Sequence, residues 1–376
     1  MATLDRWVSV LAIVVAYLTN PGAVIGAPEV FVLHQPIHPA ASQAVTYNVK
    51  AKDDRGLSAI AVFEQQEKLK LCPNGQHGCS DVILPSREIG KCQFVGRVTT
   101  SECAVTVPVG YADNSLIRYR ARATNIDGIS TDDGEIYFTA GKYDWPDDPI
   151  PIYVRGAPEV KIDLVFIPDK DYGIGSPGFM DDVGALVKES LFSEKLFASK
   201  IRDRREMWNL YITYQQGDAE PYCNRVPPPN WAIMSATVDS GFIVHKTDLT
   251  DCSGLGPGST FSAERISSTE ARFYVVPIHE LGHSVFSLAD EYRGGGLFAS
   301  SMPEHNLFID RATCEANAAN HGWPLSNCKR IRQTNYWRSD GDGDLMENTS
   351  STDHVPGPSD AGRYEWWYQN CGAGNC

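Results

Sequence analysis

The sequence predicts an α+β protein made of two parts, an all-β N-terminal part and a mixed α/β part that follows it. Three observations lead to this prediction. Between residues 27 and 140, apolar and polar residues alternate in short segments, as they do in half-buried strands. Between residues 160 and 214, two strand-like apolar segments flank a segment with helical spacing. Three prolines within residues 145–151 separate the two patterns and interrupt regular structure there.

The N-terminal pattern, residues 27–140, predicts a small β-sandwich because its alternating segments are joined by short polar turns. It is similar to the pattern of immunoglobulin-like and fibronectin-like modules. The expected strands include residues 45–49, 60–63 and 117–123, and the expected turns are residues 53–56 and 125–128.

The C-terminal part, residues 159–376, follows a proline-rich linker at residues 141–158. It begins with a strand–helix–strand unit, which favours two parallel strands in one sheet. A further strand is expected at residues 241–244. A helix is expected over residues 268–288, but Pro277 is awkward in a helix interior, so the helix alternatively starts there. The strand–helix–strand unit comprises residues 160–167, 179–198 and 207–214.

The N-terminus, residues 1–26, has the pattern of a secretory signal peptide. Arg6 precedes an apolar run at residues 7–18, and small residues allow cleavage before Ala27. An uncleaved signal anchor is the alternative. No later segment is long and apolar enough to cross a bilayer, so we expect a secreted, extracellular protein without a membrane anchor after cleavage.

Ten cysteines agree with an oxidising compartment. Pairing each cysteine with its nearest neighbour is our hypothesis for the disulfides. Asn348 begins an Asn-Thr-Ser sequon and is a candidate glycosylation site. The hypothetical pairs are Cys72–Cys79, Cys92–Cys103, Cys223–Cys252, Cys314–Cys328 and Cys371–Cys376.

The charge balance speaks against nucleic acid as a partner. The formal net charge is −14 and the sequence pI is about 5.1. A polyanion is repelled by such a surface, and no stripe of Lys and Arg offsets the acidity. The sequence does not indicate an oligomeric state.

The chemistry resides in the motif His279-Glu280-Leu281-Gly282-His283. On a helix, His279 and His283 lie one turn apart on one face, so both imidazoles can bind one ion. Zn²⁺ suits nitrogen ligands and activates water at neutral pH, and Glu280 is the candidate general base. An ordinary amphipathic helix with two exposed histidines is the alternative. Apolar flanks favour a buried helix, in which the histidines need a partner.

Residues 279–292, read as HELGHSVFSLADEY, resemble the secreted immunoglobulin A metallopeptidase family. The resemblance covers about residues 160–368 and is patchy between residues 220 and 265. It implies a metzincin-like fold, one catalytic zinc ion and endopeptidase activity, without implying that immunoglobulin A is the substrate. It also points to Asp290 as the third zinc ligand.

Asp290 can bind the same ion only if the helix ends near residues 286–288 and the chain folds back. In a continuous helix, Asp290 would lie about 10 Å beyond His283 along the axis. Common metzincins have glycine at position 286 and a ligand at position 289, where this chain has Phe286 and Ala289. Glu291 and His305 therefore remain alternative third ligands.

Two further features lie beyond the histidine motif. Residues 344–348 resemble the methionine turn that lies under the zinc ion in this family, with Met346 as the methionine, although an ordinary core methionine is the alternative. Tyr292 is a candidate oxyanion stabiliser. Asp340, Asp342 and Asp344 resemble the start of a calcium loop, but the glycine and closing glutamate of such a loop are missing, so calcium is only a weak expectation.

Together these observations predict a secreted zinc endopeptidase that acts on a protein or peptide substrate. His279, His283 and Asp290 hold the ion, and Glu280 accepts the proton of water and passes it to the leaving amine. Two alternatives stay open. One is a secreted binding or adhesion protein with a non-catalytic zinc domain, and the other is a zinc hydrolase with a non-peptide substrate.

Overall fold

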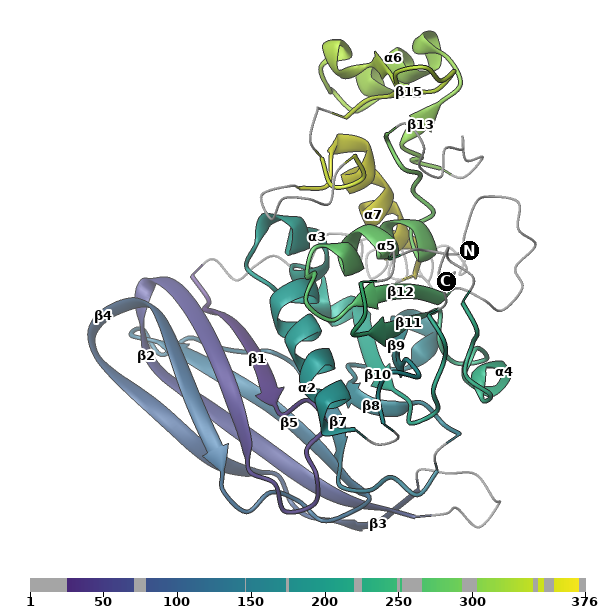
Figure 1. The fold of residues 1–376 in the computed structure, drawn as a ribbon. Coiled ribbons are helices and arrows are strands. Elements are labelled where there is room, and N and C mark those ends of the chain that lie inside the picture. The colour runs from purple at the N-terminus through teal and green to yellow at the C-terminus, as the bar shows by residue number, and fades with distance from the viewer. Residues whose placement is uncertain are drawn as a thin grey trace, which may run out of the picture.

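The computed structural model describes residues 26–70, 79–145, 147–173, 176–219, 225–248, 251, 266–292, 303–340, 344–347 and 355–371. Within them the fold is α+β, as the sequence predicts. Long strands form the N-terminal part, and a second sheet with helices forms the C-terminal part (Figure 1). The predicted signal peptide lies outside the described residues except for its last residue, Gly26.

The N-terminal strands belong to one hydrogen-bonded antiparallel sheet rather than to the two separate sheets of the expected sandwich. The reason is the length of β2, which pairs with β1 through residues 46–52 and with β5 through residues 57–68. β1 and β5 also pack together, since His34 bonds to the Tyr119 hydroxyl at 3.0 Å. The strands are β1 Glu29–Gln35, β2 Val45–Lys70, β3 Cys79–Ile83, β4 Arg87–Val107, β5 Ser115–Asn125, β6 Ser130–Asp132 and β7 Ile136–Ala140.

The C-terminal part contains a five-stranded sheet in the order β12-β11-β9-β10-β8. β9, β10, β11 and β12 run parallel, as expected for the strand–helix–strand unit, and β8 is an antiparallel edge strand built from the end of the predicted linker. The strands are β8 Ile150–Tyr153, β9 Ile162–Pro168, β10 Trp208–Ile212, β11 Ser240–His245 and β12 Ile266–Glu270.

The helices of this part are shorter than the sequence predicts. α2 Pro177–Leu186 continues as a π-helical turn over Val187–Leu191, followed by a 3₁₀ turn at Leu196–Ala198 and by α3 Ser199–Arg202. Two more 3₁₀ turns lie at Pro158–Val160 and Arg205–Met207, and α4 is Trp231–Met234.

The helix that carries the histidine motif, α5, spans Val276–Ser284. A start at residue 268 is wrong, because Ile266–Glu270 forms strand β12, which pairs with β11. The alternative start at Pro277 is right within one residue, since proline is tolerated in the first turn of a helix.

The last segment was not predicted in detail. It contains β13 Leu307–Phe308, α6 Arg311–Asn320, a 3₁₀ turn at Leu325–Asn327, β14 Lys329–Arg330, β15 Trp337–Arg338 and α7 Pro358–Cys371. The aromatic residues 366–368 lie on α7, where Trp367 and Tyr368 pack on Phe286 with ring centroids 6.4 and 6.0 Å apart. Trp367 and Tyr368 therefore contribute to the core around Phe286.

The two parts share one continuous hydrophobic core. Tyr137 of β7 and Val154 exchange backbone hydrogen bonds of 3.0 Å. His38 also bonds to the Tyr214 hydroxyl at 2.9 Å. The N-terminal sheet is therefore packed directly against the C-terminal part.

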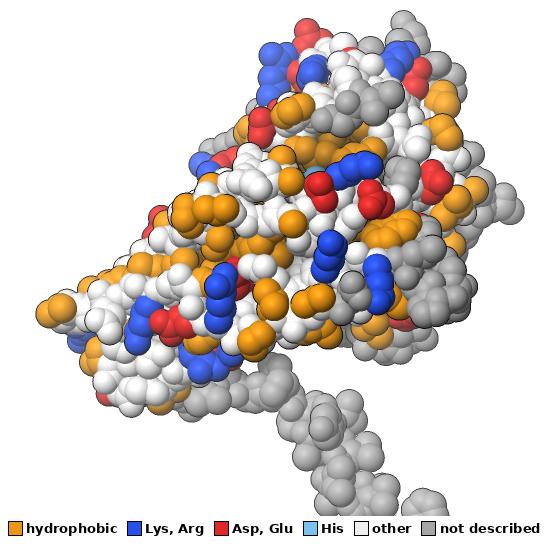
Figure 2. Space-filling view, turned by 90° about the horizontal axis from the view of Figure 1, so that it is seen from below, with side chains coloured by type: hydrophobic (Ala, Val, Ile, Leu, Met, Phe, Trp, Pro, Cys, Tyr) orange, Lys and Arg blue, Asp and Glu red, His pale blue; other side chains and the backbone are white. Residues whose placement is uncertain are grey.

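Two of the predicted disulfides are present, Cys92–Cys103 and Cys314–Cys328. The other three predicted pairs involve side chains outside the described residues. Disulfides indicate an extracellular or otherwise oxidising environment. Among the described residues, no helix is both long and apolar enough to span a membrane. On the face shown in Figure 2, acidic and basic side chains of these residues lie interspersed with apolar ones.

Candidate metal centre

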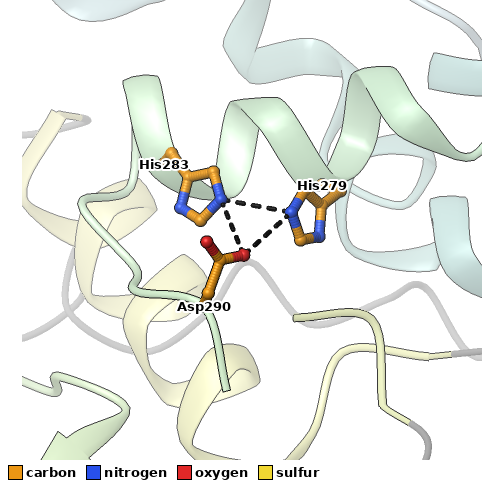
Figure 3. Close-up of side chains that lie close together, drawn as sticks. All are labelled: His279, His283 and Asp290. Atoms are coloured by element: carbon orange, nitrogen blue, oxygen red, sulfur yellow. Dashed lines mark hydrogen bonds and ion pairs between the residues drawn. The ribbon is translucent and has the colours of Figure 1, made fainter. Parts of the chain in front are cut away.

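The buried helix α5 and the loop after it bring His279, His283 and Asp290 together (Figure 3). The two Nε2 atoms of the histidines lie 3.1 Å apart. One carboxylate oxygen of Asp290 lies 3.2 Å from Nε2 of His279 and 3.3 Å from Nε2 of His283. The three candidate ligand atoms thus form a nearly equilateral triangle.

The chain folds back after α5 without the glycine that common metzincins use. Ser287 takes a left-handed conformation with φ of 56°. The Leu288 amide bonds to the Gly282 carbonyl at 2.8 Å, and the Ser287 amide bonds to the His283 carbonyl at 3.2 Å. These bonds end the helix and turn the chain back toward His279 and His283. The chain thus folds back as Asp290 requires in order to reach the same ion.

Asn306 fixes the loop on both sides of Asp290. Its side chain accepts a hydrogen bond from the Ala289 amide at 3.0 Å and donates to the Ala289 carbonyl at 2.8 Å. It also donates to the Glu291 carboxylate at 3.0 Å. Asn306 is 1% exposed, so these bonds hold the loop in a dry environment.

Backbone carbonyls determine the tautomer of both histidines. Nδ1 of His279 lies 2.9 Å from the Leu345 carbonyl, and Nδ1 of His283 lies 2.7 Å from the Leu288 carbonyl. A carbonyl only accepts, so each Nδ1 carries the proton. In the neutral rings each Nε2 then presents a lone pair, and both lone pairs face the Asp290 carboxylate. Such a cluster is stabilised by a positive charge at its centre, either a metal ion or a proton.

The size of the triangle fits zinc. Ligand atoms about 2.0–2.1 Å from a tetrahedral ion lie about 3.3 Å apart. The observed separations are 3.1, 3.2 and 3.3 Å. Two imidazoles and one carboxylate leave a fourth position open, as catalytic zinc sites do.

The surroundings shift the protonation of the ligands in the metal-free protein. Burial alone would raise the pKa of Asp290, but hydrogen bonds and charges of His279 and His283 hold it well below its usual value. Burial lowers the pKa of His283, yet Asp290 and Glu280 outweigh this and raise it to about 9. A proton therefore occupies the site when no metal does.

Glu280 is 5% exposed and lies beside the triangle without joining it. Burial raises the pKa of its carboxyl group, and the nearby histidines oppose this shift. Its Oε2 has no hydrogen-bond partner in the described part of the chain. A buried carboxylate oxygen without a partner beside a metal site is suited to accept a proton from water.

Met346, the methionine of the expected methionine turn, packs against α5 at Gly282. Met346 is fully buried, and a side chain at Gly282 would come within 2.7 Å of its sulfur, so the glycine allows the close approach. The preceding Leu345 supplies the carbonyl that orients His279. The Met346 sulfur is not among the ligand atoms of the triangle.

Tyr292 is 39% exposed and lies at the solvent side of the site. Burial, then the charge and hydrogen bonding of Asp290, raise the pKa of its hydroxyl. The group therefore stays protonated at neutral pH and is able to donate a hydrogen bond.

The alternative third ligands lie elsewhere. His305 packs against Phe308, with ring centroids 4.9 Å apart. Glu291 belongs to a second buried group of carboxylates with Asp340, Asp344 and Asp360, which could also hold a metal ion. The sequence predicted Asp340 and Asp344 as candidate ligands, but as part of a linear calcium loop. Asp342 and the sequon at Asn348 lie outside the described residues.

Sequence reasoning missed two residues of this region, Asn306 and Asp360. Both are distant in sequence from the motif and reach it only through folding. The one signal for Asn306 in the sequence is its position next to His305, an alternative third ligand. Asp360 lies in the first turn of α7, where an acidic residue is expected for the helix dipole alone.

No family model matches this sequence, and no curated protein matches it. Among solved structures, the sporulation control protein Spo0M from Bacillus subtilis is 11% identical with a TM-score of 0.22, over 32% of this chain and 51% of that chain. A DUF4466 family protein from Parabacteroides merdae is 8% identical with a TM-score of 0.19, over 28% of this chain and 42% of that chain. This chain thus spans about half or less of both structures, and such low similarity carries no argument about fold or function.

Proposed function

We propose that this chain is a secreted zinc-dependent endopeptidase. The observation that carries the proposal is the triangle of two lone-pair-bearing Nε2 atoms and one carboxylate oxygen, 3.1–3.3 Å apart. Its size and its donor types suit zinc, and it leaves one coordination position for a substrate or water.

Glu280 gives this site a catalytic residue. A zinc ion held by the triangle supplies Lewis acidity toward water and toward a peptide carbonyl. Glu280 takes a proton from the attacking water and delivers it to the nitrogen of the leaving amine, so the C–N bond breaks as the C–O bond forms. The protonated Tyr292 hydroxyl donates a hydrogen bond to the developing oxyanion.

The wider assignment rests on the resemblance of residues 279–292. We propose membership of the immunoglobulin A metallopeptidase family and a metzincin-like catalytic domain, with Met346 in the methionine turn. The chain end predicted as a signal peptide and the two disulfides support export. A glycan at Asn348 belongs to the same proposal.

The rival interpretation as a binding protein with a non-catalytic zinc site accounts less well for Glu280. A purely structural zinc site is closed by four protein ligands. Here the described residues supply three, and beside them lies the buried Glu280 carboxylate, whose Oε2 has no hydrogen-bond partner among the described residues. That arrangement favours catalysis.

The test compares Glu280→Gln with the wild-type chain on casein and gelatin. Without the base, hydrolysis should fall by a factor of about 10²–10⁴, while zinc content and the circular dichroism spectrum stay unchanged. Glu315→Gln, a carboxylate on the surface helix α6, is the control and should keep full activity. Activity in Glu280→Gln, or wild-type activity that survives a zinc chelator, contradicts the proposal.

A further inference from the structure

The second carboxylate group lies next to the candidate zinc site and carries more negative charge than its neighbours balance. Glu291, Asp340, Asp344 and Asp360 each offer an oxygen, all within 4.8 Å of one another, and none is more than 5% exposed. Arg338 brings one positive charge, with Nη1 3.8 Å from Oε2 of Glu291. One guanidinium does not balance four carboxylates, and buried charges are normally paired or bound to a metal.

Hydrogen bonds from outside the group reach one oxygen of Glu291 and one oxygen of Asp344. One oxygen of Glu291 accepts from Asn306 at 3.0 Å, and one oxygen of Asp344 accepts from the Glu347 amide at 2.9 Å. The other oxygen of each has no hydrogen-bond partner in the described residues, although Arg338 lies 3.8 Å from that of Glu291. Each of the two side chains is thus anchored through one oxygen.

Asp360 is the clearest sign of a missing ligand. It is fully buried, and neither of its oxygens receives a hydrogen bond of good geometry from the described residues, although the Asn306 amide and the Gly357 backbone are near. Leaving such a group unpaired costs several kcal/mol, on the order of the penalty for a buried charge. A bound cation removes that penalty.

The fourth side chain, Asp340, is held by the start of α7. Its oxygens accept hydrogen bonds from the Ser359 amide at 2.8 Å and from the Ser359 hydroxyl. A side chain at Gly357 would come within 2.5 Å of Asp340, so the backbone approaches this carboxylate closely. Glu291, Asp344 and Asp340 are therefore each anchored by a hydrogen bond from outside the group.

We propose that Glu291, Asp340, Asp344 and Asp360 form a calcium site. All offered ligands are oxygens, which suit Ca²⁺. The offered oxygens all lie within 4.8 Å of one another, so one ion can contact all four side chains. Mg²⁺ normally keeps several waters, for which these buried side chains leave little access.

The position of this site assigns it a role in holding the zinc ligands. Glu291 directly follows Asp290, and its amide bonds to the Met346 carbonyl at 3.1 Å. Asp344 directly precedes Leu345, whose carbonyl orients His279. Calcium thus joins the loop that carries the third zinc ligand to the turn that orients the first.

The test is calorimetric titration of CaCl₂ into the full chain, stripped of metal with a chelator and reloaded with one equivalent of zinc. We expect one calcium ion per chain, with binding on the order of 100-fold weaker in Asp360→Asn and unchanged in the exposed control Asp203→Asn. Removing calcium should weaken zinc binding roughly 10- to 100-fold, as loss of a supporting residue does. Calcium binding is measured without peptidase activity and is independent of the proposed function, whereas the positioning role rests on the proposed zinc site.

Several outcomes overturn the inference. A folded wild-type chain that binds no calcium shows that protons neutralise the group instead. Tighter binding of Mg²⁺ or Mn²⁺ overturns the choice of metal, and unchanged zinc affinity without calcium overturns the positioning role. Should Asp360→Asn fail to fold, the wild-type Tm decides: it should rise with added CaCl₂ and less with equal MgCl₂, and a Tm that ignores calcium contradicts the site.

Discussion

The N-terminal sheet and the region around α5 both bury histidines and carboxylates, yet only the first satisfies them internally. In the sheet, His34 bonds to the Tyr119 hydroxyl and to the Ile37 carbonyl. Glu64 accepts from Arg87 at 2.8 Å and from the Tyr111 hydroxyl at 2.6 Å. Each of these buried groups has protein partners and is part of the architecture.

Around α5 the same residue types point at one another. The Nε2 atoms of His279 and His283 meet across 3.1 Å, and Glu280 and Asp360 keep oxygens without partners in the described residues. The difference teaches how to separate structural from functional polar groups in this chain. A buried group with a complete set of hydrogen bonds stabilises the fold, whereas several buried ligand atoms that converge on one point and lack such bonds are suited to hold an ion.

The largest expected effect comes from removing one metal ligand. Asp290→Ala should weaken zinc binding beyond the roughly 10- to 100-fold that loss of a supporting residue causes, since one of three ligands is lost. Asp53→Ala in the N-terminal sheet is the matched control, because Asp53 is similarly buried but bonds to Asn125 and backbone amides and lies 3.9 Å from Arg55, away from the candidate metal site. It should lower the free energy of unfolding by about 1–3 kcal/mol and leave zinc affinity unchanged. Zinc titration with a chromogenic chelator checks both, and equal zinc affinity in the two variants breaks the comparison.

The next effect concerns Asn306, which positions Asp290 without touching the ion site. Asn306→Ala should weaken zinc binding roughly 10- to 100-fold. Asn209→Ala is the control, because Asn209 is a buried amide that bonds to the Arg155 amide, the Gly156 carbonyl and Asp163, away from the site. Both variants lose stability, but only Asn306→Ala should change zinc affinity. If zinc affinity falls in both variants, the effect of Asn306→Ala is general destabilisation.

The pH dependence of the free energy of unfolding tests the buried histidines of the N-terminal part. Burial lowers the pKa of His34 to about 3 and that of His38 to about 4. Both stay neutral in the folded chain, whereas in the unfolded chain they take up protons below about pH 6.5. The free energy of unfolding should therefore fall as pH drops below about 6.5, by about 1.4 kcal/mol per pH unit for each histidine. Urea unfolding at several pH values measures this slope, and His34→Gln should reduce it by about one proton.

The smallest effect is expected at the turn after α5. Ser287 has φ of 56°, where glycine is free of strain, so Ser287→Gly should raise the free energy of unfolding by about 1 kcal/mol or less. Ser42 in the N-terminal part has φ of 61° and should respond similarly when changed to glycine. Thermal unfolding compares the two variants. A loss of stability in Ser287→Gly would show that its side chain contributes more than its backbone strain removes.

The sequence predicted the elements whose pattern is local. The alternation over residues 45–49 and 117–123 and the apolar run at residues 162–167 correspond to strands β2, β5 and β9. The spacing of His279 and His283 places them on one helix face, as predicted from helical geometry alone.

What the sequence could not predict depends on contacts between distant segments. The predicted helix wrongly included residues 268–270, because the buried strand β12 shows no alternation and gains its stability from pairing with β11. Asn306 and Asp360 join the metal region only through the fold, since they follow Asp290 by 16 and 70 residues in the chain. The turn at Ser287 replaces an expected glycine by a left-handed serine, which no local pattern indicates.

The most direct test of the account is X-ray absorption at the zinc edge, on full chain loaded with one equivalent of zinc. The account predicts one zinc ion with two imidazole nitrogens and one carboxylate oxygen at about 2.0–2.1 Å, and the loss of that oxygen in Asp290→Ala. A spectrum without imidazole ligands, or one that Asp290→Ala leaves unchanged, would contradict the claim that the three side chains hold a single ion.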